Sequence, residues 1–223
     1  MTLNSDFKNT CKYPKILLTG STGQLGSELL PLLKTFGEVW APRREDFDLS
    51  FPELLRPKIR HFSPDIIINT AAFTDVDRAI EEEDLAQRIN ADAPKVIAEE
   101  AFKLSAPLIH FSTDFVFNGM KNRPYREVDN PSPINVYGKT KLEGEIAIQE
   151  NHNQYLILRT SWLYSVSHGK NFYTTMLRLF KEKETVHVVN NQIGKPTTVD
   201  FVASALIEIL NQLKSLEEGE NRW

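Results

Sequence analysis

A glycine loop between an apolar run and an amphipathic segment constrains the fold of this chain most. The apolar run, Lys15–Thr19 (KILLT), is typical of a buried strand. The loop spaces Gly20, Gly23 and Gly26 as GxxGxxG, and apolar residues then recur at helical intervals through Lys34. Glycine lets a backbone turn sharply and approach a diphosphate closely, while a helix N-terminus offers free amide hydrogens to the phosphates. This order predicts a strand–loop–helix unit that binds a dinucleotide.

The rest of the chain alternates in the same way between buried strands and amphipathic helices. We expect further strands at residues 38–41, 65–69, 108–112, 155–159 and 186–189. We expect helices at residues 52–62, with Ser50 as a candidate cap, and at 94–104, 137–149, 172–183 and 199–213. Such an alternation predicts the α/β class, as a Rossmann-type doubly wound parallel sheet with helices on both faces.

The net charge and the short apolar runs limit the binding partners and the cellular compartment that we expect. The formal net charge of −4 gives no reason to expect nucleic acid or an anionic membrane as a partner. The apolar runs are too short to span a bilayer, and a single cysteine, Cys11, cannot form an intrachain disulfide. We therefore expect a cytoplasmic protein. Residues 1–14 are polar and broken, so we expect a disordered extension there and one domain over residues 15–223.

The residues after the second expected strand bear on the choice of cofactor. Dinucleotide folds that take NAD usually place an acidic residue there for the ribose hydroxyl. This chain has Arg43 and Arg44 instead. A guanidinium matches a 2′-phosphate in shape and charge, which favours NADPH, with NADH as the alternative. Two solvated surface arginines would look the same in the sequence.

A tyrosine and a lysine one helical turn apart give the chemical signal. Tyr137 and Lys141 are spaced so that both can face one cleft. A phenol can protonate a ketone oxygen, but its ordinary pKa of about 10 is high for that role. A lysine charge about 4 Å away in an effective dielectric of about 20 supplies the roughly 4 kcal/mol that lowers the pKa to about 7. Thr113 adds a hydroxyl at the end of the fourth strand, where the ligand crevice of such a sheet lies.

Several longer motifs resemble one family. These are TGSTGQLG at 19–26, DIIINTAAFTDVD at 65–77, HFSTDFVFNG at 110–119, NVYGKTKLEGE at 135–145, RTSWLY at 159–164 and VVNNQIGKPT at 188–197. Together they are similar to the dTDP-4-dehydrorhamnose reductase family of extended short-chain dehydrogenases. The resemblance implies NADPH-dependent reduction of the 4-keto group of dTDP-4-dehydro-L-rhamnose to dTDP-L-rhamnose. It names Thr113, Tyr137 and Lys141 as the catalytic residues.

The resemblance also implies which residues bind. For the cofactor it adds Gln24, Leu25, Asp48, Leu49, Ala71 and Ala72 to the residues already singled out above, which are Gly20, Gly23, Gly26, Arg43, Tyr137 and Lys141. For the nucleotide sugar they are Thr74, Val76, Trp162, Asn171 and Phe172. Structural roles are open for some of these: Ala71, Ala72, Val76 and Trp162 as core residues, and Asn171 as a helix cap.

The chain departs from the family pattern in two ways. Phe115 stands where the family commonly has tyrosine, and family members usually continue well past the position of Trp223. We therefore expect a small, truncated C-terminal substrate lobe, with partial substrate-binding elements at about 161–183 and impaired turnover. No metal is predicted, and a homodimer is left open. Two other functions also stay open: a non-catalytic NADP-binding subunit resembling the beta subunit of methionine adenosyltransferase, and a reductase or epimerase of another nucleotide sugar.

Overall fold

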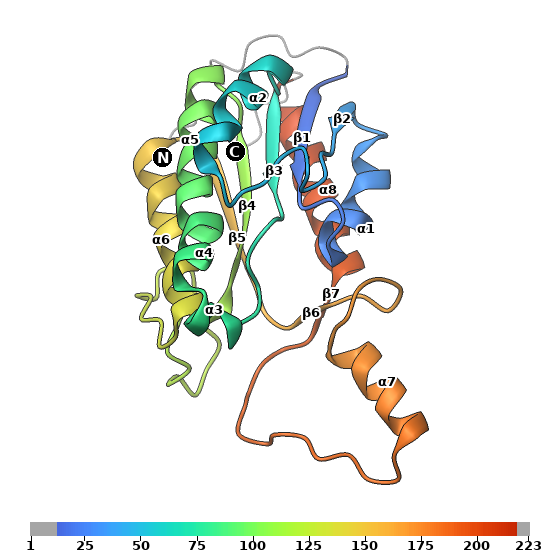
Figure 1. Ribbon diagram of the computed structural model, residues 1–223. Helices are drawn as coiled ribbons and strands as arrows, with labels where there is room; N and C mark the ends of the chain where they lie inside the picture. Colours follow the sequence, from blue (N-terminus) through green and yellow to red (C-terminus); the bar gives the residue numbers. More distant parts are fainter. Residues whose placement is uncertain (1–12, 218–223) are drawn as a thin grey trace.

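The structure, a computed structural model, is described for residues 13–217 (Figure 1). Cys11 and most of the predicted N-terminal extension lie outside this range. The chain from Lys15 onward folds around a parallel sheet of five strands in the order β2-β1-β3-β4-β5. The strands are β1 (Lys15–Thr19), β2 (Glu38–Trp40), β3 (Ile66–Asn69), β4 (Leu108–Thr113) and β5 (Tyr155–Thr160). This confirms the Rossmann-type α/β class.

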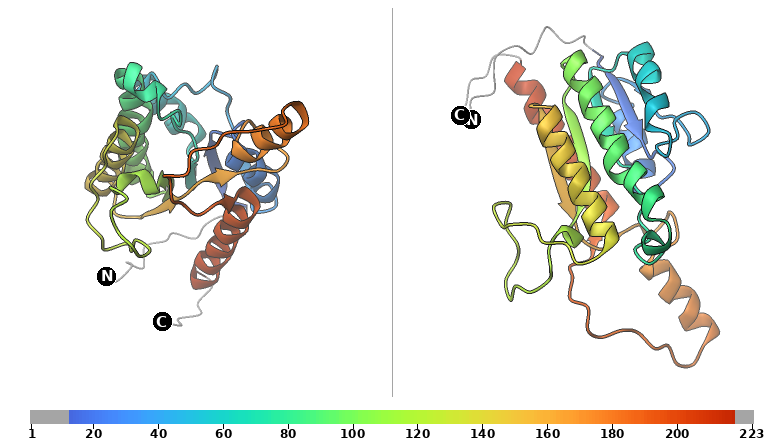
Figure 2. Two further views of the ribbon diagram at one scale, coloured as in Figure 1. Left: turned by 90° about the horizontal axis from the view of Figure 1, so that it is seen from below. Right: turned by 60° about the vertical axis from the view of Figure 1, so that its left-hand side comes forward.

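Helices cover both faces of the sheet, as Figures 1 and 2 show. Two lie on one face, α1 (Gln24–Leu33) and α8 (Val199–Glu217), and three on the other, α2 (Leu55–Phe62), α5 (Ala93–Leu104) and α6 (Val136–Asn151). Successive residues of a strand point to opposite faces, so Ile16 and Leu18 pack toward α1 and α8 while Leu17 packs toward α2 and α5. Both faces are apolar because both are buried.

Three segments differ from the sequence-based expectation. Residues 186–189 form no strand, because their side chains find no neighbouring strand and Val188 and Val189 stay exposed. Ser50 does not cap a helix; its amide and hydroxyl both donate to the Asp48 carboxylate, and the 3-10 turn at Pro52–Leu54 starts after Phe51 without a side-chain cap. Between β3 and α5 lie two unexpected short helices, α3 (Arg78–Glu81) and α4 (Glu83–Gln87), followed by a π turn at Arg88–Asp92.

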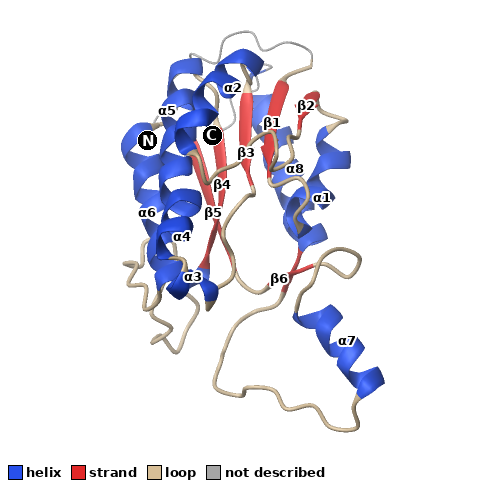
Figure 3. Cartoon of the chain, in the orientation of Figure 1, coloured by secondary structure: helices blue, strands red, loops and turns tan. Residues whose placement is uncertain are grey.

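Residues 161–198, between β5 and α8, leave the sheet at its carboxyl edge. A two-stranded pair, β6 (Leu163–Tyr164) and β7 (Thr197–Thr198), frames this excursion. Between them α7 (Phe172–Glu182) stands away from the sheet (Figure 3). Within residues 13–217, no helix combines the length and the apolar character needed to cross a membrane.

Candidate active site

A cleft of about 740 Å³ lies at the carboxyl edge of the sheet, where parallel α/β folds bind ligands. All but one of the residues proposed from the sequence for binding or catalysis line it. They are Gly20, Gly23, Gln24, Leu25, Gly26, Asp48, Leu49, Ala71, Ala72, Thr74, Val76, Thr113, Tyr137, Lys141, Trp162, Asn171 and Phe172. The exception is Arg43, whose neighbour Arg44 lines the wall instead. Residues far apart in the chain therefore meet in one place.

The glycine loop leaves no room for side chains. Gly20 has φ +72°, and a Cβ on it would lie 2.7 Å from the Ala71 nitrogen. A Cβ on Gly26 would collide with the Gly20 carbonyl oxygen. Gly23 precedes α1 and makes no side-chain cap, so the first amides of the helix are left for a ligand. This bare backbone before a helix N-terminus fits the diphosphate of a dinucleotide.

The far wall of the cleft is arranged around Asp48. Its carboxylate accepts hydrogen bonds from the Ser50 amide at 2.9 Å and the Ser50 hydroxyl at 2.7 Å, and pairs with Arg44 at 3.3 Å. Burial raises the pKa of Asp48, but the bonds from Ser50 and Arg44 outweigh it and hold the pKa below its ordinary value. The wall thus keeps one fixed anion with a mostly exposed guanidinium beside it.

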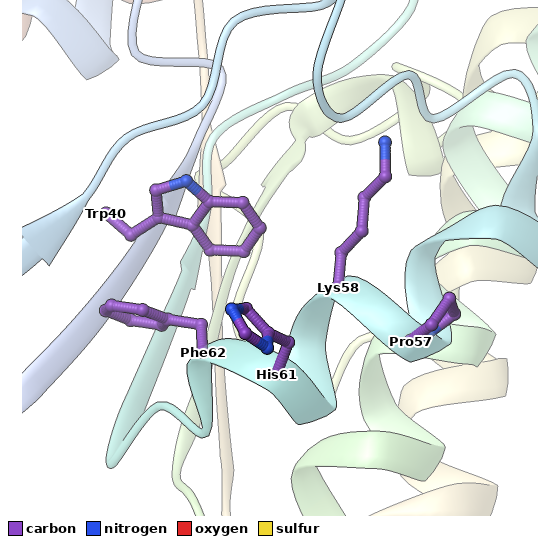
Figure 4. Close-up of a pocket in the computed structure, with 5 residues that line it drawn as sticks. All are labelled: Trp40, Pro57, Lys58, His61 and Phe62. Carbon is purple, nitrogen blue, oxygen red and sulfur yellow. The ribbon is translucent and has the colours of Figure 1, made fainter.

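A second, smaller hollow of about 370 Å³ lies between β2 and α2. Figure 4 shows it lined by Trp40, Pro57, Lys58, His61 and Phe62, with the Trp40 and Phe62 rings facing each other at 5.3 Å between centroids. None of the candidate residues lines this hollow. The candidate chemistry is therefore gathered in the larger cleft.

Tyr137 enters the cleft from the first turn of α6. Asn135 starts that helix by accepting a hydrogen bond from the Gly138 amide at 2.7 Å, which fixes where the tyrosine lies. The Tyr137 ring contacts the Phe115 ring edge-on at 5.6 Å. Burial raises the pKa of Tyr137 to about 12; the Asp114 charge adds to this, and a hydrogen bond with Thr113 opposes it. The pKa is thus raised, not lowered as expected, and the phenol keeps its proton at neutral pH.

The position of Lys141 explains why the pKa of Tyr137 is not lowered as the spacing of the two residues predicted. Its side chain is buried, and its Nζ donates to the Phe111 carbonyl oxygen at 2.7 Å while lying 3.1 Å from His110 Nε2. Burial lowers the pKa of Lys141 to about 8, and the charge of Glu145 opposes this. The amine is therefore held against β4, and its charge does not depress the pKa of the phenol.

His110 itself is fully buried under the cleft floor. Burial, and next the Lys141 charge, lower the pKa of His110 well below its ordinary value. An unfolded histidine binds a proton near pH 6.5 and the folded one does not, so the unfolded state binds more protons as the pH falls. We expect the free energy of unfolding to drop by about 1.4 kcal/mol per pH unit below about pH 6.5 on account of His110.

Urea unfolding at pH 7 and pH 5 measures this loss. In His110→Phe, the free energy of unfolding should fall less between pH 7 and pH 5 than in the wild-type protein. The pH dependence that remains should come partly from His152, whose pKa is also lowered by burial. An equal slope in the variant and the wild-type protein would show that His110 is not the source.

Gln24 links the glycine loop to the segment beyond the sheet. Its Oε1 accepts hydrogen bonds from the Ser165 amide at 2.9 Å and from Asn171 Nδ2 at 2.7 Å. Asn171 also caps α7 by accepting from the Thr174 amide at 2.9 Å, which confirms its structural role as a cap. One glutamine thus ties the start of α1 to the start of α7.

Gln24→Ala should loosen that connection. It leaves the buried Ser165 amide without a partner, which costs about 1–3 kcal/mol. Hydrogen–deuterium exchange across residues 165–172 should speed up by about tenfold or more. The surface variant Gln149→Ala on α6 should leave exchange in this segment unchanged. Equal protection in Gln24→Ala and wild type would contradict the role of Gln24.

Comparisons with known proteins agree with this geometry. The family model described as RmlD substrate binding domain matches residues 14–221. A dTDP-4-dehydrorhamnose reductase of Salmonella typhimurium is 46% identical over 192 residues, 84% of this chain. The crystal structure of the Bacillus anthracis dTDP-4-dehydrorhamnose reductase in complex with NADP superposes with TM-score 0.83 at 38% identity, covering 92% of this chain and 72% of that one.

The chain belongs to the dTDP-4-dehydrorhamnose reductase family. A Clostridium acetobutylicum member of known structure gives TM-score 0.85 at 38% identity, over 89% of this chain and 70% of that one. The chain spans 64% of the length of the Salmonella relative. The UDP-glucose 4-epimerase of Thermus thermophilus, 20% identical with TM-score 0.74 over 88% of this chain and 74% of that one, shares the fold alone.

Within this dTDP-4-dehydrorhamnose reductase fold, sequence reasoning missed Asp114, which lines the cleft, and two buried residues that support it. Asp114 accepts hydrogen bonds from the Ser161 hydroxyl at 2.7 Å and the Thr113 hydroxyl at 3.2 Å, which ties β4 to the segment after β5. Its place directly after Thr113 was the available signal. His110 lies four residues before Asp114, in β4, and the sequence gave no signal for it. A lone histidine inside an apolar strand is most simply a core residue.

Asn90 was missed as well. Its side-chain oxygen accepts from the Phe73 amide at 2.9 Å, and its nitrogen donates to the Phe73 carbonyl at 3.0 Å and to the Thr140 hydroxyl at 3.2 Å. The Asn90 side chain therefore holds the loop after β3 against α6. It lies in the π turn, which no sequence pattern indicated.

Proposed function

We propose that this chain carries the NADPH-dependent reduction of the 4-keto group of dTDP-4-dehydro-L-rhamnose to dTDP-L-rhamnose. The observation that supports this most is that the glycine cradle and the Thr113, Tyr137 and Lys141 side chains line one cleft. The family membership supports the same reaction. Residues 161–183 are proposed to supply part of the substrate-binding surface, through Trp162, Asn171 and Phe172.

The proposed roles follow from the chemistry of each side chain. When bound, the reduced nicotinamide supplies a hydride to the carbonyl carbon. Tyr137, which holds its proton at neutral pH, donates it to the ketone oxygen. The Thr113 hydroxyl orients that oxygen beside the phenol. Lys141 keeps one hydrogen on the Phe111 carbonyl and presents its amine from the cleft floor. The same three groups favour an enzyme over a non-catalytic NADP-binding subunit, which needs no acid.

Arg44 is proposed to set the preference for NADPH over NADH. It lines the cleft beside Asp48, whereas Arg43, named from the sequence, does not. One charge-assisted bond to a 2′-phosphate contributes about 1.5–3 kcal/mol, or about tenfold to a hundredfold in affinity. Arg44→Ala should therefore lose most of the preference, and Arg43→Ala should keep it.

Titration of both cofactors into the wild-type protein and the two variants measures the effect. If only Arg43→Ala lost the preference for NADPH over NADH, Arg43 and not Arg44 would be the residue that recognises the 2′-phosphate. Equal affinities for NADPH and NADH in the wild type would remove the proposal for both arginines.

The reaction itself is tested by following NADPH oxidation with a panel of 4-keto sugar nucleotides that differ in base and in sugar. Turnover of the dTDP-linked 4-keto-rhamnose above the others is expected. Cofactor binding without turnover of any of them, both in this chain and in a form extended at its C-terminus, would favour the non-catalytic subunit. A different preferred substrate would favour a reductase of another nucleotide sugar.

A further inference from the structure

Residues 165–171, between β6 and α7, are held against the glycine loop by Gln24. At the two ends of this stretch, the Ser165 amide donates to Gln24 Oε1 at 2.9 Å and Asn171 Nδ2 donates to it at 2.7 Å. Within the stretch Gly169 has φ +75°, and a Cβ on it would lie 2.8 Å from Gln24 Cγ. The backbone before α7 therefore lies directly on the side chain that begins α1 (Figure 1).

Lys170 lies between Gly169 and Asn171 in this stretch, and it lines the cleft. Both of these neighbours pack against or bond to Gln24, which is the first residue of α1. The first backbone amides of α1 are the ones left free for the diphosphate of a dinucleotide. A lysine has a flexible stem and an ammonium with three donors, so the Lys170 side chain starts close to the place where a diphosphate would be bound.

The other cations that line the cleft already have partners. Arg44 pairs with Asp48 at 3.3 Å, and Lys141 Nζ donates to the Phe111 carbonyl oxygen at 2.7 Å. Lys170 is exposed, and within residues 13–217 its side chain makes no ion pair and no hydrogen bond. A diphosphate is strongly anionic, whereas the start of a helix offers only about half an elementary positive charge. Of the cations described in the cleft, Lys170 is the one left free to supply the rest.

We propose that Lys170 binds the diphosphate of the dinucleotide cofactor. This inference rests on the proposed function and adds to the NADPH site a charge that the glycine loop does not supply. The ammonium forms a charge-assisted hydrogen bond with a phosphate oxygen, which fastens residues 165–171 to the bound cofactor. Because Asn171 and Phe172 follow directly, the bound cofactor also steadies the residues proposed to contact the sugar.

A nucleotide sugar carries a diphosphate too, so the same chemistry has two possible sources in this cleft. The contacts of Gln24 favour the cofactor, because they place the neighbours of Lys170 on the helix that follows the glycine loop. Two probes separate the sources. Thymidine diphosphate carries the diphosphate of the sugar nucleotide, and adenosine 2′,5′-bisphosphate has the 2′-phosphate end of NADPH without its diphosphate.

Calorimetric titration without turnover tests the proposal. Lys170→Gln removes the charge and keeps a polar side chain, and it should weaken NADPH binding by about threefold to tenfold, an effect that shrinks at high salt. Lys170→Arg should retain most of the affinity. Binding of adenosine 2′,5′-bisphosphate should be unchanged in Lys170→Gln but weakened in Arg44→Ala, which acts at the other end of the cofactor.

Lys181→Gln is the matched control, because it removes the same charge from an exposed residue of α7 that does not line the cleft. Unchanged NADPH affinity in Lys170→Gln, or an equal loss in Lys181→Gln, would overturn the proposal. A larger loss for thymidine diphosphate than for NADPH would assign Lys170 to the nucleotide sugar and also overturn it. If the wild-type protein does not bind NADPH, the proposed function fails as well; wild-type binding that Lys170→Gln leaves intact removes only the role of Lys170.

Discussion

Tyr137→Phe is expected to lower kcat for the 4-keto sugar nucleotide by about 10²–10⁴-fold, the usual contribution of a general acid. The substitution removes one hydroxyl and leaves the ring in its edge-on contact with Phe115. The ring stays buried, and the Asn135 cap that positions this turn of α6 is untouched. Cofactor affinity should therefore change little. Steady-state kinetics and NADPH titration on the same preparation measure both quantities.

Tyr155→Phe is the matched control for this experiment. It removes the same hydroxyl from a half-exposed residue of β5, outside the cleft, and should leave kcat unchanged. An unchanged kcat in Tyr137→Phe would remove Tyr137 from the proposed mechanism. A loss confined to cofactor affinity would instead point to a binding role.

The second large effect is expected from Gly26→Ala. The new methyl group would overlap the backbone of Gly20 and Ser21, which cannot move aside as a flexible side chain could. Overpacking of this kind costs about 1–3 kcal/mol in the free energy of unfolding. The loop also has to move away from the diphosphate position, and a displacement of about 1 Å can cost about 10²-fold in rate.

Gly23→Ala, three residues earlier, is the internal control. A methyl group there would lie 3.3 Å from the Gly20 carbonyl oxygen, and Gly23 has an ordinary φ of −78°. Its free energy of unfolding, measured without cofactor, should fall much less than that of Gly26→Ala. Equal losses in the two variants would mean that close packing at Gly26 is not what the loop requires.

The centre of the sheet was predictable because β1, β3 and β4 are short apolar runs that are largely buried. Ile66, Ile67 and Ile68 illustrate this: such a short run is typical of a strand buried on both faces, and it lies in β3 between β1 and β4. The same reasoning was wrong for residues 186–189. An apolar run forms a strand only when a neighbour supplies hydrogen bonds, and the sequence does not state which strands are adjacent.

The site was predictable where function restricts the backbone or uses a recognisable pair, as at Gly20, Gly26, Tyr137 and Lys141. Partnerships between distant side chains were not. The surroundings of Lys141 depend on His110 and Asn69, which lie 31 and 72 positions earlier in the chain, so the lowered pKa of the lysine and the raised pKa of Tyr137 could not be read from the spacing of the pair.

The bonds of Asn90 have a consequence for how this family can vary. Phe73 is held to α6 through residue 90 and not through the two short helices that intervene in the chain. Ala79 and Ala86 are buried, but insertions or deletions between them, at residues 80–84, can change the outer surface while the spacing between the loop after β3 and the helix of Tyr137 stays constant. Length variation among relatives should gather in that stretch, and an asparagine should follow it at the same distance from α5.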